Sequence, residues 1–386
     1  MKRNHFNLQI AAFLIIRTVI NTCLRMVGPF LLVFAKGVGS DINAMSAAVS
    51  VSFAAAAVGP FLAQIADRYG RKSGMLLGLV IFTTGVGLML IWPVYMAFLI
   101  ALLMASLGNN LFLSGIQAYI SDMVPYEKRG FSLSLLEISW AGSFIVGVPV
   151  IGFLIARAGW QSPFLSLFVL GVLSIAAVAL LFPHTPPLVR AVGDTDSRFA
   201  IILRSPAALF GLAMAFLVIA GNNLISVIFG VWMEQSYGLK IAAIGAAATV
   251  IGFAELAGEG VVALVVDKLG KHRTIAIGFV VNIFSAVIPF FIQGSIVGAL
   301  IWLFIFYFSF EVTFAAAIPL MSEVLPQARA TLLAVFLAAS SLGMAAGVFF
   351  GPRIYEAGGF TVNVIVAMLV NIIGLIMLPR VRRALA

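Results

Sequence analysis

Three glutamates lie in the middle of long apolar segments, where an ionised side chain is costly. Glu255 and Glu259 are four residues apart, so they share one face of a helix, and Glu311 lies within a later segment. Two carboxylates this close in a low dielectric cannot both stay ionised cheaply. We therefore interpret Glu255, Glu259 and Glu311 as candidates for reversible proton binding. The alternatives are an ion pair with a buried arginine and, for Glu311, recognition of a cationic molecule.

A polar stripe lies in the first apolar segment. Arg17, Asn21 and Arg25 are spaced i, i+4 and i+8, so they line one side of a helix. A guanidinium group keeps its charge, and each arginine therefore needs an anion or several acceptors. The stripe can pair with a buried glutamate or bind an anionic group of a ligand. Further candidates for ligand binding are the amides Asn109, Asn110, Gln117, Asn222 and Asn223.

These residues are set in a chain that is too apolar for a soluble protein. Of the 386 residues, 62% are hydrophobic and 10% are charged, whereas soluble domains have about 25% charged residues. The composition excludes a soluble enzyme, a disordered chain and a disulfide scaffold. Since about 20 apolar residues cross a bilayer, the sequence predicts an all-α membrane protein with twelve transmembrane helices. We place them near 8–35, 44–66, 74–93, 95–120, 131–157, 163–182, 206–234, 241–266, 274–293, 295–320, 329–355 and 360–379.

The second half of the chain repeats the first. Asp67–Lys72 recurs as Asp267–Arg273, and Ser121–Pro125 recurs as Ser322–Pro326, with offsets near 200 residues. Two six-helix halves in parallel orientation are a known plan of membrane transport proteins. The predicted domains are an N-terminal six-helix bundle (1–182), a cytoplasmic linker (183–205) and a C-terminal six-helix bundle (206–386). We expect the charges inside the membrane to converge on a wet pocket shared by the two bundles.

The positive charges predict the orientation in the membrane. With the N-terminus inside, 17 of the 23 lysines and arginines fall on the inner side. Because cytoplasmic loops carry the excess of Lys and Arg, both termini are expected in the cytoplasm. The net charge of +9 is explained in the same way, and we expect no nucleic-acid partner.

At the loop between the second and third segments the chain resembles the major facilitator superfamily. The family pattern Gly-x-x-x-Asp-Arg-x-Gly-Arg-Arg/Lys is matched from Asp67 to Lys72, with Ala63 in place of the leading glycine. The resemblance implies that this loop is a conformational latch. Asp67 would lie at the N-terminus of the eleventh helix, where the helix dipole favours a carboxylate, and Arg71 would pair with Asp122. The latch candidates are Asp67, Arg68, Gly70, Arg71 and Asp122, and by the repeat Asp267, Gly270, Lys271 and Glu323.

The fifth segment adds a resemblance to the drug/proton antiporter group of this superfamily. Gly147–Gly152, followed by Gly159–Phe164, is similar to the group's glycine- and proline-rich helix, with Val148 and Phe153 replacing two glycines. The arginine that many drug antiporters carry in the fourth helix is Met104 here. The resemblance implies a secondary transporter that exports a small amphiphilic or drug-like molecule by alternating access, coupled to protons.

Two other transport functions stay open. A lipid or lysolipid flippase would use Arg17 and Arg25 to hold an anionic headgroup, and a carrier could instead take up a small organic anion. The sequence has no nucleotide-binding loop of the Gly-x-x-x-x-Gly-Lys-Ser/Thr type and no hydrolase motif. We therefore expect no enzyme activity, no metal, and no cofactor, with a proton gradient as the energy source. The expected partners are the bilayer and a small-molecule substrate, and we expect a monomer in a bacterial plasma (inner) membrane.

Overall fold

The structure is a computed structural model that describes residues 3–59, 70–123, 137–183, 195–292 and 294–383. All regular elements in this part of the chain are helices. Contacts divide the chain into two compact units, unit 1 over 1–191 and 240–252 and unit 2 over 192–239 and 253–386. The helix Ile241–Leu269 begins in unit 1 and ends in unit 2.

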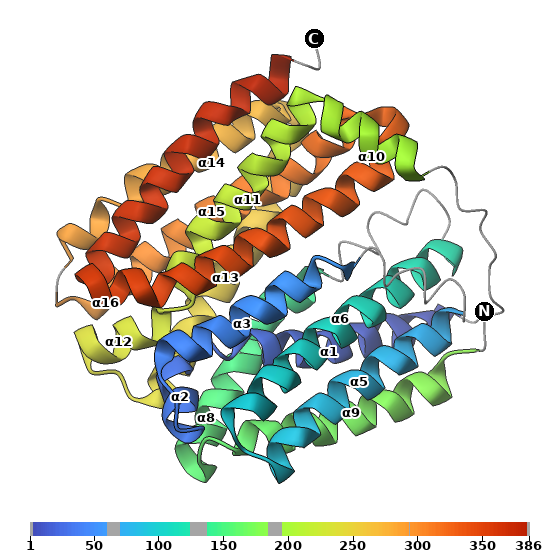
Figure 1. The fold of residues 1–386 in the computed structure, drawn as a ribbon, viewed down its shortest axis with the longest axis vertical. Coiled ribbons are helices and arrows are strands. Elements are labelled where there is room, and N and C mark those ends of the chain that lie inside the picture. Colours follow the sequence, from blue (N-terminus) through green and yellow to red (C-terminus); the bar gives the residue numbers. More distant parts are fainter. Residues whose placement is uncertain (1–2, 60–69, 124–136, 184–194, 293, 384–386) are drawn as a thin grey trace. The chain divides into compact units, whose positions relative to one another are not determined.

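Unit 1 is built from apolar helices that pack along one another (Figure 1). They are α1 (Arg3–Arg25), α2 (Leu31–Gly37), α3 (Ile42–Ala56), α5 (Arg71–Ile91), α6 (Tyr95–Met123), the π-helix η1 (Ser143–Gly147), α8 (Val148–Ala158) and α9 (Ser162–Leu181). Helix α5 lies between α6 and α9 in the packing, and α1 contacts α6, η1 and α9. Asp41 begins α3 as an N-cap, because its carboxylate accepts a hydrogen bond of 2.7 Å from the Ala44 N–H.

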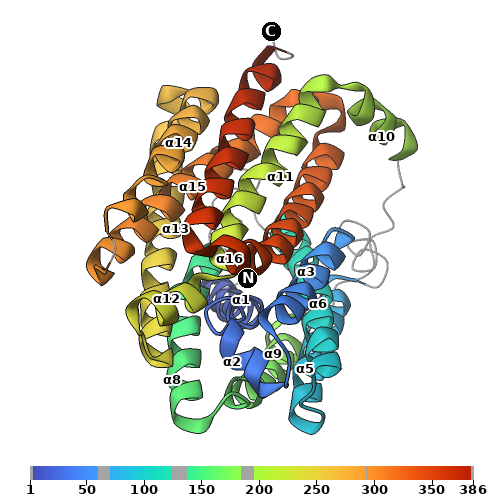
Figure 2. The same ribbon diagram turned by 60° about the vertical axis from the view of Figure 1, so that its left-hand side comes forward.

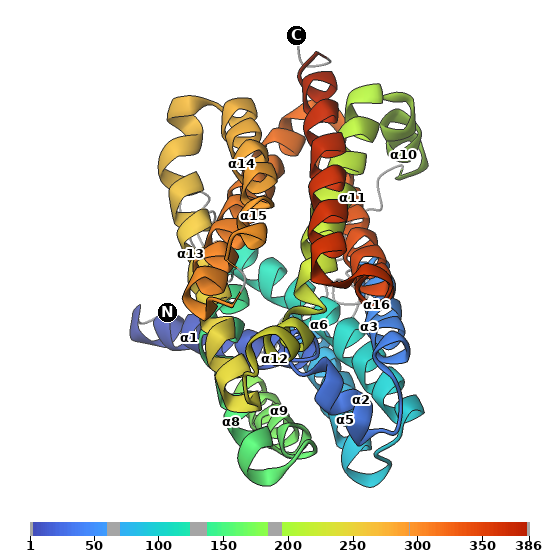
Figure 3. The same cartoon turned by 90° about the vertical axis from the view of Figure 1, so that its left-hand side faces the viewer.

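Unit 2 is also built from helices, most of which are long and apolar (Figure 2). They are α10 (Thr195–Arg204), α11 (Pro206–Ser226), α12 (Phe229–Tyr237), α13 (Ile241–Leu269), α14 (Lys271–Ser285), η2 (Ile288–Phe290), α15 (Ile296–Val324), η3 (Pro326–Ala328) and α16 (Arg329–Arg383). Ser205 and Ser295 cap α11 and α15 through their hydroxyls. Helix α11 packs along α16, and α14 packs along α15 (Figures 2 and 3).

The backbone repeats between the two halves. Gly70 and Gly270 have φ of 89° and 82°, and each comes directly before a helix. Gly159 and Gly359 likewise have φ of 84° and 72°. Because L-residues with side chains rarely adopt positive φ, these glycines fix the same turn at the same place in both halves. The structure thus has the two pseudo-symmetric six-helix halves that the sequence repeat predicts.

Ten helical segments among the described residues are long and apolar enough to cross a membrane. The last of them, Pro326–Val381, has 56 residues, which is more than twice the ~20 residues that one crossing requires. It is interrupted at Gly359, whose backbone is not helical, so it accounts for two crossings. The shorter apolar helix Ile42–Ala56 covers the described part of the second predicted segment. The predicted twelve-helix membrane fold is confirmed.

The structure differs from the predicted segments in a few places. The first segment is broken at Met26–Phe30, between α1 and α2, and the seventh is broken between α11 and α12. The predicted linker contains helix α10. The two breaks were missed because hydropathy stays high on both sides of each, although Gly28 and Pro29 mark the first one as a turn.

Candidate functional site

The stripe on α1, formed by Arg17, Asn21 and Arg25, contacts the fifth span (Glu137–Ala158) in unit 1. Arg17 is buried, and its Nη1 lies 3.1 Å from Oε1 of Glu137, whose side chain is half exposed. Asn21 is buried and its Nδ2 donates a hydrogen bond of 3.3 Å to the Ser139 hydroxyl. Of the two roles predicted for Arg17, the structure therefore contains a pair with a glutamate, and the partner is Glu137.

Arg25 is held by the same span one turn further on. Its Nη1 donates a hydrogen bond of 2.7 Å to the Trp140 carbonyl. The Cζ atom lies 4.2 Å from the centre of the Trp140 ring and 3.7 Å from that of the Phe144 ring, in cation–π geometry. The Ser143 hydroxyl donates to the same Trp140 carbonyl over 2.6 Å.

A π-helix brings these groups together. It runs from Ser143 to Gly147 and begins three residues after Trp140, and such widened turns are frequent at functional sites. Gly147 allows α1 to approach, since a Cβ there would overlap the Thr22 hydroxyl. All three polar side chains of the α1 stripe are thus bound to residues 137–143. The i, i+4, i+8 spacing predicted that the three side chains share one face of the helix, but it could not identify the residues that they contact.

The candidate proton site lies in unit 2, on α13 and α15 (Figure 3). Glu255 is 2% exposed and Glu311 is 6% exposed, although both carry ionisable groups. Glu259 is half-buried. The stem of Glu311 packs against Gly258, where a Cβ would lie 2.7 Å from Cβ of Glu311. Glu311 therefore leaves α15 beside the turn of α13 that carries the other two glutamates.

The candidate amides have different surroundings. Asn110 donates to the Ala56 carbonyl over 3.2 Å, and Asn223 donates to the Ile219 carbonyl of its own helix over 2.9 Å. Gln117 is exposed. The Oδ1 of Asn109 and the Nδ2 of Asn222 are buried without a hydrogen-bond partner among the described residues. These two amides have a free polar atom for a ligand or water.

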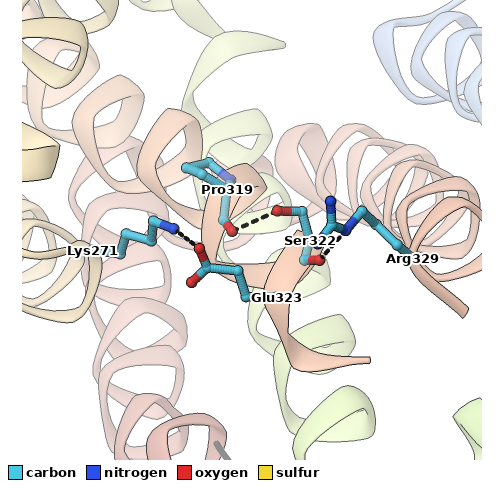
Figure 4. A network of polar contacts seen from close by, with 5 residues as sticks. All are labelled: Lys271, Pro319, Ser322, Glu323 and Arg329. Atoms are coloured by element: carbon cyan, nitrogen blue, oxygen red, sulfur yellow. Dashed lines mark hydrogen bonds and ion pairs between the residues drawn. The ribbon is translucent and has the colours of Figure 1, made fainter. Parts of the chain in front are cut away.

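The predicted latch pairs lie at equivalent places in the two units. In unit 1, Nε of Arg71 lies 3.2 Å from Oδ2 of Asp122. In unit 2, Lys271 pairs with Glu323, and both are more exposed than Arg71 (Figure 4). The Ser322 carbonyl next to Glu323 accepts a hydrogen bond of 2.8 Å from Arg329 Nε, which ties α15 to the start of α16.

The other latch candidates are turn residues or lie outside the described residues. Gly70 and Gly270 are the residues before α5 and α14, with positive φ. Asp267 is exposed in the last turn of α13. Asp67 and Arg68 lie outside the described residues, as does the predicted contact of Asp67 with the eleventh helix.

An apolar groove in unit 1 was not predicted. It has a cavity volume of about 440 Å³ and lies between α1, the fifth span and α9, and its walls include Thr18, Thr22, Ser139, Val146, Gly147 and Leu170. The hydroxyls of Thr18 and Thr22 donate to carbonyls of their own helix, over 2.8 and 2.7 Å. The groove therefore suits a hydrocarbon chain better than a polar group. Its only sequence signal is the glycines of the fifth span.

Buried amides of unit 2 were also not predicted. Asn371 donates to Asn282 over 3.0 Å, and Asn282 donates to the Phe306 carbonyl over 2.9 Å. They link α14, α15 and α16 inside the unit, where such bonds are not replaced by water. Within the described residues, no group of three or more His, Cys, Asp or Glu side chains could hold a metal ion.

The fold is that of a multi-pass membrane transport protein, and sequence comparison identifies the family. The Major Facilitator Superfamily profile matches residues 13–220 and 211–385, so it covers nearly the whole chain. The protein belongs to the Major Facilitator Superfamily. It is an integral, multi-pass membrane protein with a transporter fold.

Individual relatives agree with this assignment. The Uncharacterized MFS-type transporter YceJ of Bacillus subtilis is 26% identical over 76% of this chain and 75% of its own length. The Multi-drug resistance efflux pump PmrA of Streptococcus pneumoniae is 26% identical over 66% of each chain. Among solved structures, a bacterial homologue of the human lysosomal transporter Spinster superposes with a TM-score of 0.80 at 14% identity, covering 100% of this chain and 98% of that one.

Proposed function

We propose that the protein exports a small amphiphilic molecule in exchange for protons, by alternating access. The observation that carries the proposal is the burial of Glu255 and Glu311 on helices that cross the membrane. An ionised carboxylate at mid-membrane costs at least ~2.5 kcal/mol, so binding a proton there is favourable when the site opens to an acidic side. The name of the relative PmrA, a multi-drug resistance efflux pump, supports export.

Proton binding changes the charge of the site and therefore its affinity for substrate. When a carboxylate of this group takes up a proton from a hydronium ion, an O–H bond of the hydronium breaks, an O–H bond of the carboxylic acid forms, and the site loses one negative charge. A cationic substrate then binds more weakly and is released on the proton-rich side. Release of the proton on the other side restores the charge. A ligand can drive such an exchange only through its different affinities for the two states.

The direct test uses purified protein in liposomes with an imposed pH gradient. Ethidium and tetraphenylphosphonium are the probes, as amphiphilic cations, together with one amphiphilic anion. We expect the wild-type protein to move at least one cation against its gradient only when the pH gradient is present. The absence of gradient-driven movement of every probe, in protein that is folded, overturns the proposal.

A flippase is the second candidate, because the groove in unit 1 is apolar and contains the π-helix. Its predicted headgroup site is less favourable, since Arg25 is stacked on Trp140 and Phe144 and Arg17 is paired with Glu137. A lipid phosphate would have to replace those contacts. Movement of a fluorescent phospholipid between leaflets, without movement of the water-soluble cations, would favour the flippase.

A further inference from the structure

The groove in unit 1 has a rim of exposed apolar side chains. Its walls belong to α1, the fifth span and α9, which are all long and apolar enough to cross a membrane. At the rim, Ile15, Val146 and Val150 are 65%, 58% and 50% exposed. Apolar side chains that are exposed on a membrane span face hydrocarbon. The groove is therefore open to the acyl chains of the bilayer.

The walls of the groove have four hydroxyl groups, and each is bonded within the protein. Those of Thr18 and Thr22 donate to carbonyls of α1 over 2.8 and 2.7 Å. The Ser166 hydroxyl donates to a carbonyl of α9 over 3.1 Å, and that of Ser139 accepts from Nδ2 of Asn21 over 3.3 Å. No residue that lines the groove is charged. A hydrocarbon chain fits such walls, because it leaves all of these hydrogen bonds intact.

The groove is long enough for an acyl chain. On the fifth span it extends from Ile138 to Leu154, which corresponds to about 24 Å along the helix axis. One leaflet contributes about half of the ~30 Å hydrocarbon core. The cavity volume is about 440 Å³. The groove can thus hold a chain over the full depth of one leaflet.

A cation lies just beyond one end of the groove. Val150, Leu154 and Arg157 are spaced i, i+4 and i+7, so they share one side of the fifth span. The first two line the groove, and Arg157 lies in the last turn of the span. Arg157 is exposed, and its Cζ lies 4.9 Å from the centre of the Phe153 ring. Trp160 follows the end of the span, as aromatic residues do at membrane interfaces.

This position suits a phosphate group. A guanidinium presents several N–H donors that match the oxygens of a phosphate, and contact with an aromatic ring does not use those donors. The phosphates of phospholipids lie at the membrane interface, directly outside the hydrocarbon core. A lipid whose chain enters the groove from this end would therefore place its phosphate near Arg157.

We propose that the groove and Arg157 form a binding site for one anionic phospholipid of the bilayer. An acyl chain lies between α1, the fifth span and α9, and the phosphate pairs with Arg157. The bound lipid fills the space between the three helices and stabilises unit 1. The site includes none of the carboxylates Glu255, Glu259 and Glu311, so the proposal does not depend on proton-coupled export.

The test is native mass spectrometry of the delipidated protein in detergent, titrated with dioleoyl phosphatidylglycerol. Val150→Trp places a large side chain at the rim of the groove. Val172→Trp is its control, since Val172 is 46% exposed on α9 and does not line the groove. We expect one tightly bound lipid in the wild-type protein and in Val172→Trp, and its loss in Val150→Trp. Added lipid should raise the thermal unfolding temperature of the same two proteins only.

The headgroup contact is tested separately. Arg157→Gln should weaken binding of the lipid about fivefold. Arg380→Gln is the matched control and should leave binding unchanged, because Arg380 is also exposed and its Cζ lies 5.1 Å from the centre of an aromatic ring, that of Phe210. Dioleoylglycerol, which has the same chains and no phosphate, should bind more weakly than the phospholipid, and equally to the wild-type protein and Arg157→Gln.

Tight binding that persists in Val150→Trp overturns the proposal. Wild-type affinity in Arg157→Gln also overturns it, as does an equal loss in Arg380→Gln or equal binding of dioleoylglycerol and phosphatidylglycerol. If Val150→Trp does not fold, the arginine variants still decide, since both side chains are exposed. None of these measurements involves transport, so their outcome is separate from that of the proposed function.

Discussion

Nη1 of Arg17 lies 3.1 Å from Oε1 of Glu137, joining α1 to the beginning of the fifth span. The arginine is buried and the glutamate is half exposed, so the two partners differ in how much water they have lost. Removing the glutamate leaves a buried guanidinium without this anion, which is more costly than losing an exposed pair. Loss of the pair should therefore affect the buried Arg17 on α1 more than the half-exposed Glu137.

This relationship leads to a stability prediction. Glu137→Gln should lower the free energy of unfolding by roughly 1–3 kcal/mol, less than for a fully buried pair because Glu137 keeps part of its hydration. Thermal unfolding in detergent measures the loss. The exchange Arg17→Glu with Glu137→Arg should recover part of it, and a double variant less stable than both single variants would contradict a direct pair.

The π-helix supplies a matched pair of glycine variants. Gly147→Ala should destabilise the protein by roughly 1–3 kcal/mol, because the new methyl group overlaps the Thr22 hydroxyl. Gly142→Ala should be nearly neutral, since its Cβ would lie 3.5 Å from the Thr18 hydroxyl, an ordinary contact. Thermal unfolding of both variants checks the difference. Adding Thr22→Ala should restore the stability of the Gly147→Ala variant. If it does not, the overlap with Thr22 is not the cause of the loss.

The two latch pairs should differ in strength. Arg71 has a side chain that is 4% exposed, whereas the Lys271 and Glu323 side chains are 23% and 52% exposed. We expect Arg71→Ala to change the rate of probe transport about tenfold, which corresponds to ~1.4 kcal/mol, and Lys271→Ala to change it less, as for exposed pairs. Lys36→Ala, at an exposed position in α2, is the control. Equal effects of Arg71→Ala and Lys271→Ala would contradict the claim that the more buried pair contributes more to transport.

Much of the fold was predictable because a membrane span requires a long apolar segment, and loops with turn residues separate those segments. The repeat was also visible in the sequence. The structure explains part of it, because Gly70 and Gly270 both adopt a positive φ that residues with side chains rarely adopt. The break between α1 and α2 was missed because both sides of it are apolar, although Gly28 and Pro29 within it are a turn signal.

The candidate site was predictable in its residue types but not in its contacts. Arg17, Glu255 and Glu311 were recognisable because charges are rare within spans. Glu137 as the partner of Arg17 depends on tertiary packing 120 residues away in sequence. Gly258 was missed because a glycine within a transmembrane helix has many possible reasons, and only the position of Glu311 distinguishes them.

Measurement of proton movement is the most direct test of whether Glu255, Glu259 and Glu311 form the proton site. Liposomes that contain a pH-sensitive dye should show proton flux with the wild-type protein when a transported cation is added. Replacing Glu255, Glu259 and Glu311 together by glutamine should abolish that flux, while Glu356→Gln, at an exposed position in α16, should preserve it. Cation-dependent proton flux at the wild-type rate in the triple variant would contradict the assignment of the proton site to these carboxylates.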